Sequence, residues 1–439
     1  MTANESSQHW SVLGAGMLGM TLALRLAQAG KKVTLVEAAP SLGGLASSWS
    51  LGDIVWDRYY HVTLLSDTVL RELLDDLGLE EEIDWRTTKT NFYAGTDIYP
   101  LNNVFDYLKL PAMRFMDKIR MGATIVFASW RTNGVPLERY RVDDWLIRRS
   151  GKRTFNAIWR PLLRAKLGDN YKHASAAFIW SVIRRFYAAR RGGMKTEMFG
   201  YVPGGYARVI DALNQKLTEA GVEILTAAPV SEIIHNEVGH EILAGEHRLD
   251  CDRVAVCFAA PIASKVCQAL QPAEKEKLND IRYQGVICAS VLLNRPLGGA
   301  YLTYITDESL PFTTVIEMSS LIDRKLIGGN HLVYLPKYVP SDDPWLEYED
   351  SEIESRFRAG LQKMFPNLDS GDILAFQISR TRHVLALSTL NYSQLMPKME
   401  TSISGLYLVN SAQIVNASLN VNDTVKLANE SAEKLLAQN

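Results

Sequence analysis

Residues 10–45 hold glycine and acidic residues at a spacing suited to binding a dinucleotide. They are a glycine triplet, an acid that ends an apolar run, and a glycine pair: Gly14, Gly16, Gly19, Glu37, Gly43 and Gly44. The first glycine permits a tight turn, the second lets the backbone approach a pyrophosphate, and the third lets a helix pack closely on a strand. A carboxylate about 20 residues further on accepts hydrogen bonds from a ribose diol.

The elements that position these residues form a strand–helix–strand unit. Trp10 to Leu13 are predicted to form a strand, Met17 to Ala29 a helix that Gly30 ends, and Lys32 to Glu37 the next strand. The helix N terminus supplies free N–H groups and a positive dipole end for phosphates. The motif alone leaves open a glycine-rich turn of another α/β fold. The predicted contacts are Gly14, Ala15, Gly16, Met17, Leu18, Gly19, Glu37 and Ala38.

The glycine pair distinguishes between two cofactors, because a nicotinamide-binding domain needs no second backbone-exposing turn after the acid. With this pair, the region resembles the flavin-containing superfamily of amine oxidases, protoporphyrinogen oxidases, carotenoid desaturases and UDP-galactopyranose mutases. In that superfamily the loop lies along the pyrophosphate and isoalloxazine of FAD. The resemblance implies FAD contacts from Gly43, Gly44 and Leu45.

Three further segments resemble the same superfamily. In the first, Tyr201–Tyr206 precede a predicted helix from Ala207 to Ala220 and strands between Val222 and Ile233. The second, Asp252–Pro261, resembles the strand by which the chain returns to the nucleotide-binding sheet. The third, Gly405–Asn410, is a predicted strand near the C terminus. The final helix is expected to open around Asn422 and Asp423, with Asp423 as its N-cap and its N–H groups toward the flavin. The resemblance implies FAD contacts from Val230 (against the adenine), Asn410, Ser411, Asn420, Val421 and Asn422.

The chain also departs from the superfamily pattern. Asn410 and Ser411 stand where a glycine and an acid are frequent, Ala428 where a glycine is frequent, and Leu45 where amine oxidases carry arginine. No cysteine lies in the C-terminal segment where monoamine oxidases attach flavin covalently, so we expect non-covalent FAD. The departures favour desaturase-, protoporphyrinogen-oxidase- and mutase-like relatives over amine oxidases.

Two residues are candidates for catalysis. His61, in the segment Trp56–Thr63, resembles a histidine that lies beside the flavin in desaturases and mutases; it could instead be a packed loop histidine. Lys337 could order a water at flavin N5, as a lysine does in amine oxidases, or be an edge lysine that extends along apolar surface.

Residues 101–200 are basic and predicted to be helical. They hold 20 Lys and Arg against 7 Asp and Glu, a balance of +13, whereas the whole chain carries −2. Helices are expected over 104–109, 112–130, 142–149, 153–167 and 174–191. Arg160 and Arg164 are candidates for binding an anionic substrate. Alternatively, the basic region contacts a membrane with Trp130, Trp145, Trp159 and Trp180 at the interface, or is a solvated face.

Composition excludes several other classes. The chain of 439 residues has four cysteines without metal spacing, so we expect reduced thiols and no metal. Because the start is polar, we expect no signal peptide. We also expect no membrane span, since the longest apolar run is too short, and no nucleic-acid binding, since no such motif accompanies the positive charge. We expect a cytoplasmic protein, membrane-associated if the basic region contacts lipid.

These patterns predict an α/β protein, α+β overall, with an FAD-binding Rossmann-type domain of monoamine-oxidase-like architecture and a second, mixed substrate domain. The first domain is expected to comprise residues 1–95, 200–284 and 385–439, and the second 96–199 and 285–384. The predicted function is transfer of a hydride from the carbon of a small-molecule substrate to flavin N5. A redox-neutral sugar mutase and a non-enzymatic dinucleotide-binding scaffold are the alternatives.

Overall fold

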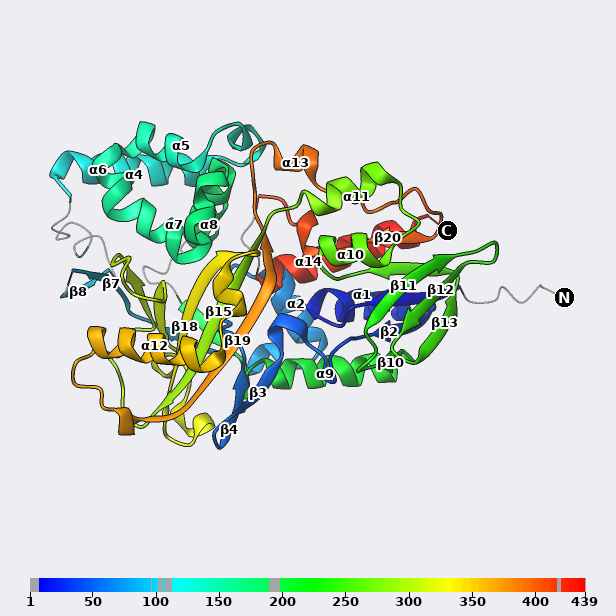
Figure 1. Ribbon diagram of the computed structural model, residues 1–439, viewed down its shortest axis with the longest axis horizontal. Coiled ribbons are helices and arrows are strands. Elements are labelled where there is room, and N and C mark those ends of the chain that lie inside the picture. Colours follow the sequence, from blue (N-terminus) through cyan, green and yellow to red (C-terminus); the bar gives the residue numbers. More distant parts are fainter. Residues whose placement is uncertain are drawn as a thin grey trace.

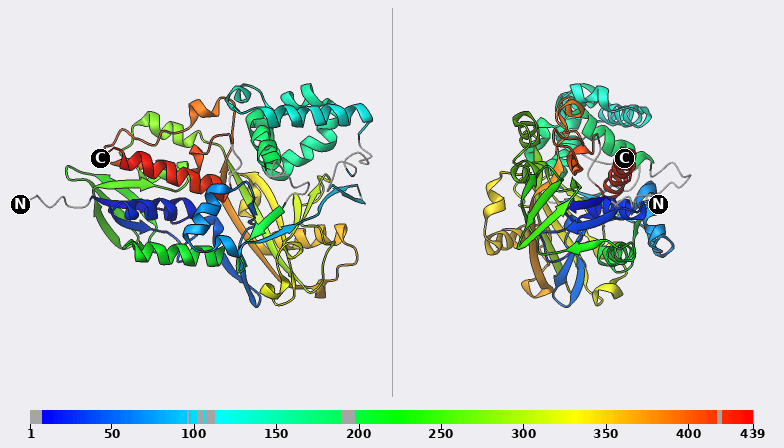
Figure 2. Two further views of the ribbon diagram at one scale, coloured as in Figure 1. Left: turned by 180° about the vertical axis from the view of Figure 1, so that it is seen from behind. Right: turned by 90° about the vertical axis from the view of Figure 1, so that its right-hand side faces the viewer.

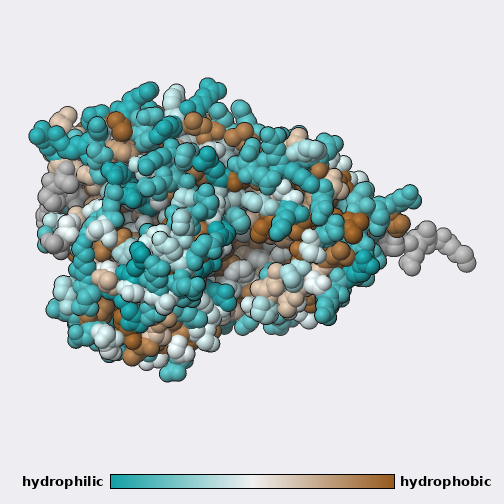
Figure 3. Space-filling view, in the orientation of Figure 1, coloured by the Kyte–Doolittle hydropathy of each residue, from teal (hydrophilic) through white to brown (hydrophobic). Residues whose placement is uncertain are grey.

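The computed structural model describes residues 8–95, 97–101, 106, 113–188, 198–416 and 420–438. A parallel sheet lies at the end that carries both chain termini, and a larger sheet lies at the other end beneath a layer of helices (Figure 1). On the face in Figure 3, hydrophobic residues are scattered among hydrophilic ones. None of the helices in the described ranges is long and apolar enough to cross a membrane.

The parallel sheet has five strands in the order β10-β2-β1-β14-β20. All four neighbouring pairs are parallel, and β1 lies at the centre. Covered on both faces, these strands are rich in valine and leucine. Their bounds are β1 His9–Leu13, β2 Lys32–Val36, β10 Glu223–Leu225, β14 Arg253–Val256 and β20 Leu406–Leu408.

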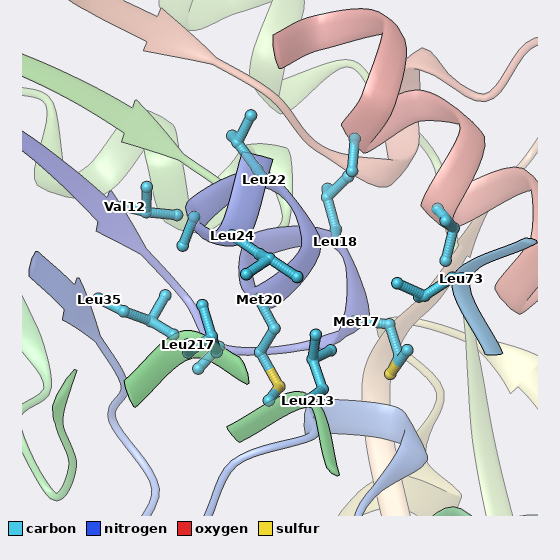
Figure 4. Packing of buried hydrophobic residues seen from close by; sticks show 14 of the residues in the cluster. Val12, Met17, Leu18, Met20, Leu22, Leu24, Leu35, Leu73, Leu213 and Leu217 are labelled. Carbon is cyan, nitrogen blue, oxygen red and sulfur yellow. The ribbon is translucent and has the colours of Figure 1, made fainter. Parts of the chain in front are cut away.

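Helix α1 is the centre of the core beside this sheet. It is buried almost all round and packs against α9 and α14, and Figure 4 shows Met20 of α1 beside Leu213 of α9. Figure 2 shows α14 running alongside α1, so the two ends of the chain close one core. The bounds are α1 Met17–Gln28, α2 Thr68–Asp76, α9 Gly205–Glu219 and α14 Val421–Leu436. The other face is covered by α10 Ala260–Val266 and by the antiparallel strands β11 Val230–His235, β12 His240–Ala244 and β13 His247–Cys251. Helix α11 Pro272–Asn279 follows α10.

The larger sheet has seven strands in the order β19-β15-β18-β17-β16-β7-β8. Successive side chains point to opposite faces. Val333, Leu335 and Val339 pack under helix α12 (Asp350–Met364), whereas Tyr334 and Tyr338 pack on the other face with Trp56. The bounds are β7 Thr90–Ala94, β8 Asp97–Pro100, β15 Tyr283–Leu293, β16 Leu302–Ile305, β17 Thr314–Glu317, β18 His331–Pro340 and β19 Ile373–Ala386.

Two small antiparallel sheets complete the β-structure described above. Strand β9 pairs with β5 and β6, and β3 forms a hairpin with β4. The bounds are β3 Ser48–Leu51, β4 Ile54–Asp57, β5 Thr63–Leu64, β6 Asp84–Thr87 and β9 Met198–Tyr201.

The helical layer comes from the basic region of the sequence. Its helices are α4 Phe115–Trp130, α5 Val142–Ser150, α6 Lys152–Thr154, α7 Arg160–Leu167 and α8 Ala176–Ala188. A π-helical turn, Phe155–Trp159, joins α6 to α7 just before Pro161. Proline has no N–H to donate to the preceding turn, which accounts for the widened helix there. A short helix, α13 Tyr392–Leu395, lies nearer the C terminus.

Most predicted elements are confirmed within a few residues. Of the predicted helix over 104–109 only residue 106 is described, and it is helical; residues 189–191 of the helix predicted over 174–191 lie outside the described residues. The predicted N-cap of the last helix is wrong: α14 begins at Val421, its cap is Asn420, and Asp423 is the third helical residue. The prediction also lacked β19, whose Arg380, Arg382 and His383 interrupt the apolar pattern.

Candidate functional site

The two glycine turns near the N terminus touch each other. The Gly43 N–H donates to the Ala15 carbonyl at 2.8 Å, and Gly43 forms a bridge with Gly16. Gly14 and Gly43 have φ of 103° and 107°, a conformation that side chains other than glycine rarely adopt. A Cβ at Gly44 would lie 3.1 Å from the Gly16 Cα, so only glycines allow this approach.

Gly16 and Gly19 have different roles at the start of α1: Gly19 allows close packing, and Gly16 leaves space beside the helix N terminus. A Cβ at Gly19 would overlap the carbonyl oxygen of Gly14, so this glycine is needed for packing. A Cβ at Gly16 would meet no described atom within 4 Å, although Gly16 is the N-cap and has no side chain to cap the helix. This space lies at the positive end of the helix, where the first-turn N–H groups have no acceptor within the helix, as a pyrophosphate site requires.

Glu37 lies immediately after β2 and holds the two loops in place. One carboxylate oxygen accepts the Ala15 N–H at 2.7 Å and the other accepts the Ala39 N–H at 2.9 Å. Each oxygen keeps a further lone pair for a ribose diol. The Glu37 carbonyl accepts the Ala228 N–H, which brings the start of β11 at Val230 close to the exposed Ala38.

The C-terminal segment reaches the same carboxyl edge of the parallel sheet, because β20 runs parallel to β14 and β14 to β1. Asn410 follows β20 and is fully buried; its oxygen accepts the Ala412 N–H, but its amide nitrogen has no partner among the described residues. A buried amide N–H without an acceptor is costly, and a polar ligand atom would relieve that cost. Ser411 begins the next turn, and Asn420, Val421 and Asn422 form the start of α14. The glycine turns, Glu37 and this unpaired amide fit FAD.

The predicted histidine lies in the loop after β4. His61 Nδ1 is 3.8 Å from Asp57 Oδ2, within ion-pair range but too long for a hydrogen bond, and its ring is 4.8 Å from that of Tyr206. Asp57 is buried and accepts the Tyr206 N–H at 2.8 Å. Burial raises the pKa of Asp57, and His61 and the Tyr206 N–H partly offset this rise.

A second polar group beside His61 could not be found from the sequence. The hydroxyls of Tyr60 and Tyr338 share a hydrogen bond of 2.7 Å, and Lys166 Nζ donates to Tyr338 at 3.0 Å. Burial and Tyr338 raise the pKa of Tyr60, which keeps it a neutral phenol. Of this group, only Tyr60 lies next to His61 in the sequence. Tyr338 and Lys166 come from distant elements, so no local pattern indicates that they meet Tyr60.

The other three predicted residues line a different cavity. Arg160, Arg164 and Lys337 face a space of about 490 Å³ between α7 and strands β16 and β18. Strand β18 pairs with β15 through Lys337, whereas its pairing with β17 covers only Val333 and Tyr334. Lys337 shares the face of Val333 and Val339, away from Tyr338 and His61, because side chains alternate along the strand. The structure therefore does not bring the two catalytic candidates together.

A parallel sheet whose glycine turns meet at a helix N terminus defines a dinucleotide-binding protein of the Rossmann type, and the second glycine turn indicates a flavin. Residues 18–414 match the family of flavin-containing amine oxidoreductases, and the chain belongs to that family. It is an FAD-dependent oxidoreductase, and the predicted fold class is confirmed.

The chain is also similar to individual proteins in sequence or in structure. The chain is 23% identical over 430 residues to the 15-cis-phytoene desaturase of Solanum lycopersicum, covering 90% of this chain and 72% of the desaturase. The crystal structure of a protein described as a protoporphyrinogen oxidase, from Exiguobacterium sp. 255-15, superposes with a TM-score of 0.77 at 15% identity, covering 99% and 100% of the chains. Reduced UDP-galactopyranose mutase gives 0.74 at 14% identity, covering 99% and 94%.

Three glycine variants separate cofactor binding from folding. We expect Gly16→Ala to weaken FAD binding at least tenfold, or about 1.4 kcal/mol, because the added methyl group enters the space beside the helix N terminus. The melting temperature of its apoprotein should change by less than about 2 °C. Gly19→Ala should lower that temperature markedly, since the methyl group overlaps Gly14. FAD titration and thermal denaturation measure both effects.

Gly122→Ala is the matched control, because a Cβ there also meets no described atom and the residue lies within α4. It should leave FAD affinity unchanged. Equal FAD affinity of Gly16→Ala and wild type would show that the phosphates lie elsewhere.

The raised pKa of Asp57 predicts a pH-dependent stability. The folded protein holds this proton more tightly than the unfolded chain, so burying the carboxylate is costly above the raised pKa. The cost disappears as the pH falls toward the ordinary value of 3.8. Asp57→Asn should therefore raise the melting temperature at pH 7 by about 2 °C, with a gain that shrinks on acidification.

The exposed Asp53, in the turn between β3 and β4, offers a control on the same hairpin. Asp53→Asn should show no such pH-dependent gain. A lower melting temperature of Asp57→Asn than of wild type at pH 7 would contradict a net cost of the buried carboxylate.

Proposed function

We propose that the chain catalyses transfer of a hydride from a carbon of a small-molecule substrate to N5 of non-covalently bound FAD. The bound flavin supplies the electron chemistry, so the protein must hold it, orient the substrate and exclude water. The observation that carries the proposal is the contact between the two glycine turns at the N terminus of α1. Membership of an oxidoreductase family supports the reaction class.

The FAD contacts are proposed for the backbone of both turns, Glu37 and the C-terminal segment. They are Gly14, Ala15, Gly16, Met17, Leu18, Gly19, Glu37, Ala38, Gly43, Gly44, Leu45, Val230, Asn410, Ser411, Asn420, Val421 and Asn422. We further propose that 1–95, 200–284 and 385–439 act as the FAD-binding domain and the remainder as the substrate domain. The parallel sheet supports this division, because its strands come from all three segments.

On the substrate side we propose that His61, Tyr60 and Lys166 line the reacting region. His61 rests on the buried Asp57, and Lys166 places a positive charge beside two phenols on the same face of the seven-stranded sheet. Such groups can orient a substrate and hold or release a proton at its heteroatom. Lys337 has no part in this arrangement, because it lies on the other face.

Reduction of the flavin by candidate substrates tests the reaction class. Anaerobic mixing with one of a panel of amines, porphyrinogens and polyenes should bleach the absorbance of oxidised flavin, and an electron acceptor should restore it. Lys166→Met should slow this bleaching at least tenfold, which corresponds to about 1.4 kcal/mol. The control is Lys172→Met, since Lys172 is 54% exposed.

Similarity to the mutase structure makes the redox-neutral alternative testable in the same experiment. Dithionite-reduced protein should leave UDP-galactopyranose unchanged. Turnover of that sugar by reduced protein, without net electron transfer, would replace the oxidoreductase reaction by an isomerisation.

We also propose that α4 contacts an anionic membrane surface. Its exposed apolar side chains fall on one face, opposite the buried Met121, Thr124 and Ala128, at the end of the molecule remote from the termini (Figure 1). They are Phe115, Met116, Ile119, Val126 and Trp130. Arg114 and Arg120 are exposed on the same helix, and each basic residue near such a surface contributes about 1 kcal/mol.

Only one of the four tryptophans expected at the interface fits this arrangement. Trp130 is 72% exposed, whereas Trp145, Trp159 and Trp180 are buried in the helical core. The expectation that these three lie at a membrane surface is wrong, because they pack the helices together.

Vesicle binding tests the α4 surface. Wild type should bind vesicles that contain phosphatidylserine more strongly than phosphatidylcholine vesicles, and Ile119→Lys should reduce that binding about tenfold, because it removes buried apolar area. Val238→Lys makes a similar change on the β11–β12 hairpin, where the residue is 90% exposed, and should have no effect. Equal losses in both variants would argue against α4.

A further inference from the structure

The cavity beside α7 contains a lysine that the proposed reaction does not use. Lys337 is partly buried, and its Nζ lies 4.2 Å from the centroid of the Trp345 ring. No carboxylate of the described residues is within 4.0 Å of this ammonium group. A cation withdrawn from water without an anion is costly, and an aromatic face compensates only in part.

Most other charges around the cavity are already paired, whereas Asp343 has no ion pair among the described residues. Glu308 forms ion pairs with both Arg160 and Arg164, and Arg164 also pairs with Asp169 at 3.3 Å. Asp307 pairs with Lys363.

Asp343 accepts the N–H of Trp345 at 2.9 Å, as the cap of a short helical turn. It lies beyond ion-pair distance of Lys337, although it opposes the effect of burial, which lowers the pKa of that lysine. The cavity therefore keeps one positive charge without a close partner.

The remaining wall of the cavity combines apolar side chains with the polar Asn156, Thr306, Thr313 and Tyr338. The larger apolar side chains are Phe92, Pro161, Ile305, Leu310, Phe312 and Pro340. A volume of about 490 Å³ is within the range of small-molecule sites, which combine apolar walls with few polar groups. A ligand with one negative charge and an apolar body matches both features.

This cavity borders the region of His61 and shares Tyr338 with it, but neither His61 nor Lys166 lines the cavity. The Lys337 side chain emerges from β18 on the face covered by α12, whereas the Tyr338 hydroxyl bonds that of Tyr60 on the other face. The two side chains therefore leave the strand in opposite directions.

We propose that the cavity between α7 and β18 is a second ligand site, which binds an amphipathic monocarboxylate through the ammonium group of Lys337. The carboxylate would pair with Lys337 and the apolar body would lie between Pro161 and Phe312. The site goes beyond the proposed oxidoreductase reaction and does not depend on it.

Calorimetric titration of the FAD-loaded protein with octanoate, and with octan-1-ol as its uncharged counterpart, tests this site. We expect saturable binding of one octanoate per chain and at least tenfold weaker binding of octan-1-ol. Lys337→Met should weaken octanoate binding at least tenfold, whereas Lys337→Arg, which keeps the charge, should retain most of it. Should the Met variant not fold, Lys337→Gln takes its place.

Lys166→Met is the control, because Lys166 lies with Tyr338 on the opposite face of the strand. It should leave octanoate binding unchanged. Absence of saturable octanoate binding to the wild type, or unchanged binding to Lys337→Met, would overturn the proposal. So would loss of binding in Lys166→Met, which would locate octanoate at the flavin side.

Discussion

The whole arrangement depends on the contact between two backbone turns, 27 residues apart by sequence from Gly16 to Gly43. The Gly43 N–H donates to the Ala15 carbonyl, and Glu37 fixes both ends of the connection by accepting the N–H groups of Ala15 and Ala39. A side chain at Gly44 would press against Gly16, and Gly43 has a φ that other residues rarely adopt. With glycines, the N terminus of α1 stays open toward a ligand, and the buried amide of Asn410 supplies a donor from the other end of the chain.

The local part of this site could be predicted from the sequence. Glycine spacing, a following acid and helical periodicity are encoded within 36 residues, so the βαβ unit and its proposed cofactor contacts needed no tertiary information. The start of the last helix was harder, because Asn420 and Asp423 are both good caps. The choice of Asn420 depends on the path of the chain before the helix, which the local pattern does not specify.

Residues that meet only through tertiary structure could not be predicted. Lys166 and Tyr338 come from the helical layer and from the seven-stranded sheet, and nothing near either residue indicates the other. The separation of Lys337 from His61 depends on strand register, since a shift of one residue would exchange the two faces. Strand β19 was missed for a related reason: it sits at the edge of the sheet, where charged residues obscure the alternation.

Selective uptake of the cofactor by the apoprotein tests the central claim most directly. Titrations with FAD and with NAD(P), followed by absorbance and tryptophan fluorescence, should show one tightly held FAD per chain that heating releases, and no measurable nicotinamide binding. An apoprotein that stays colourless with FAD and takes up a nicotinamide dinucleotide would contradict the account.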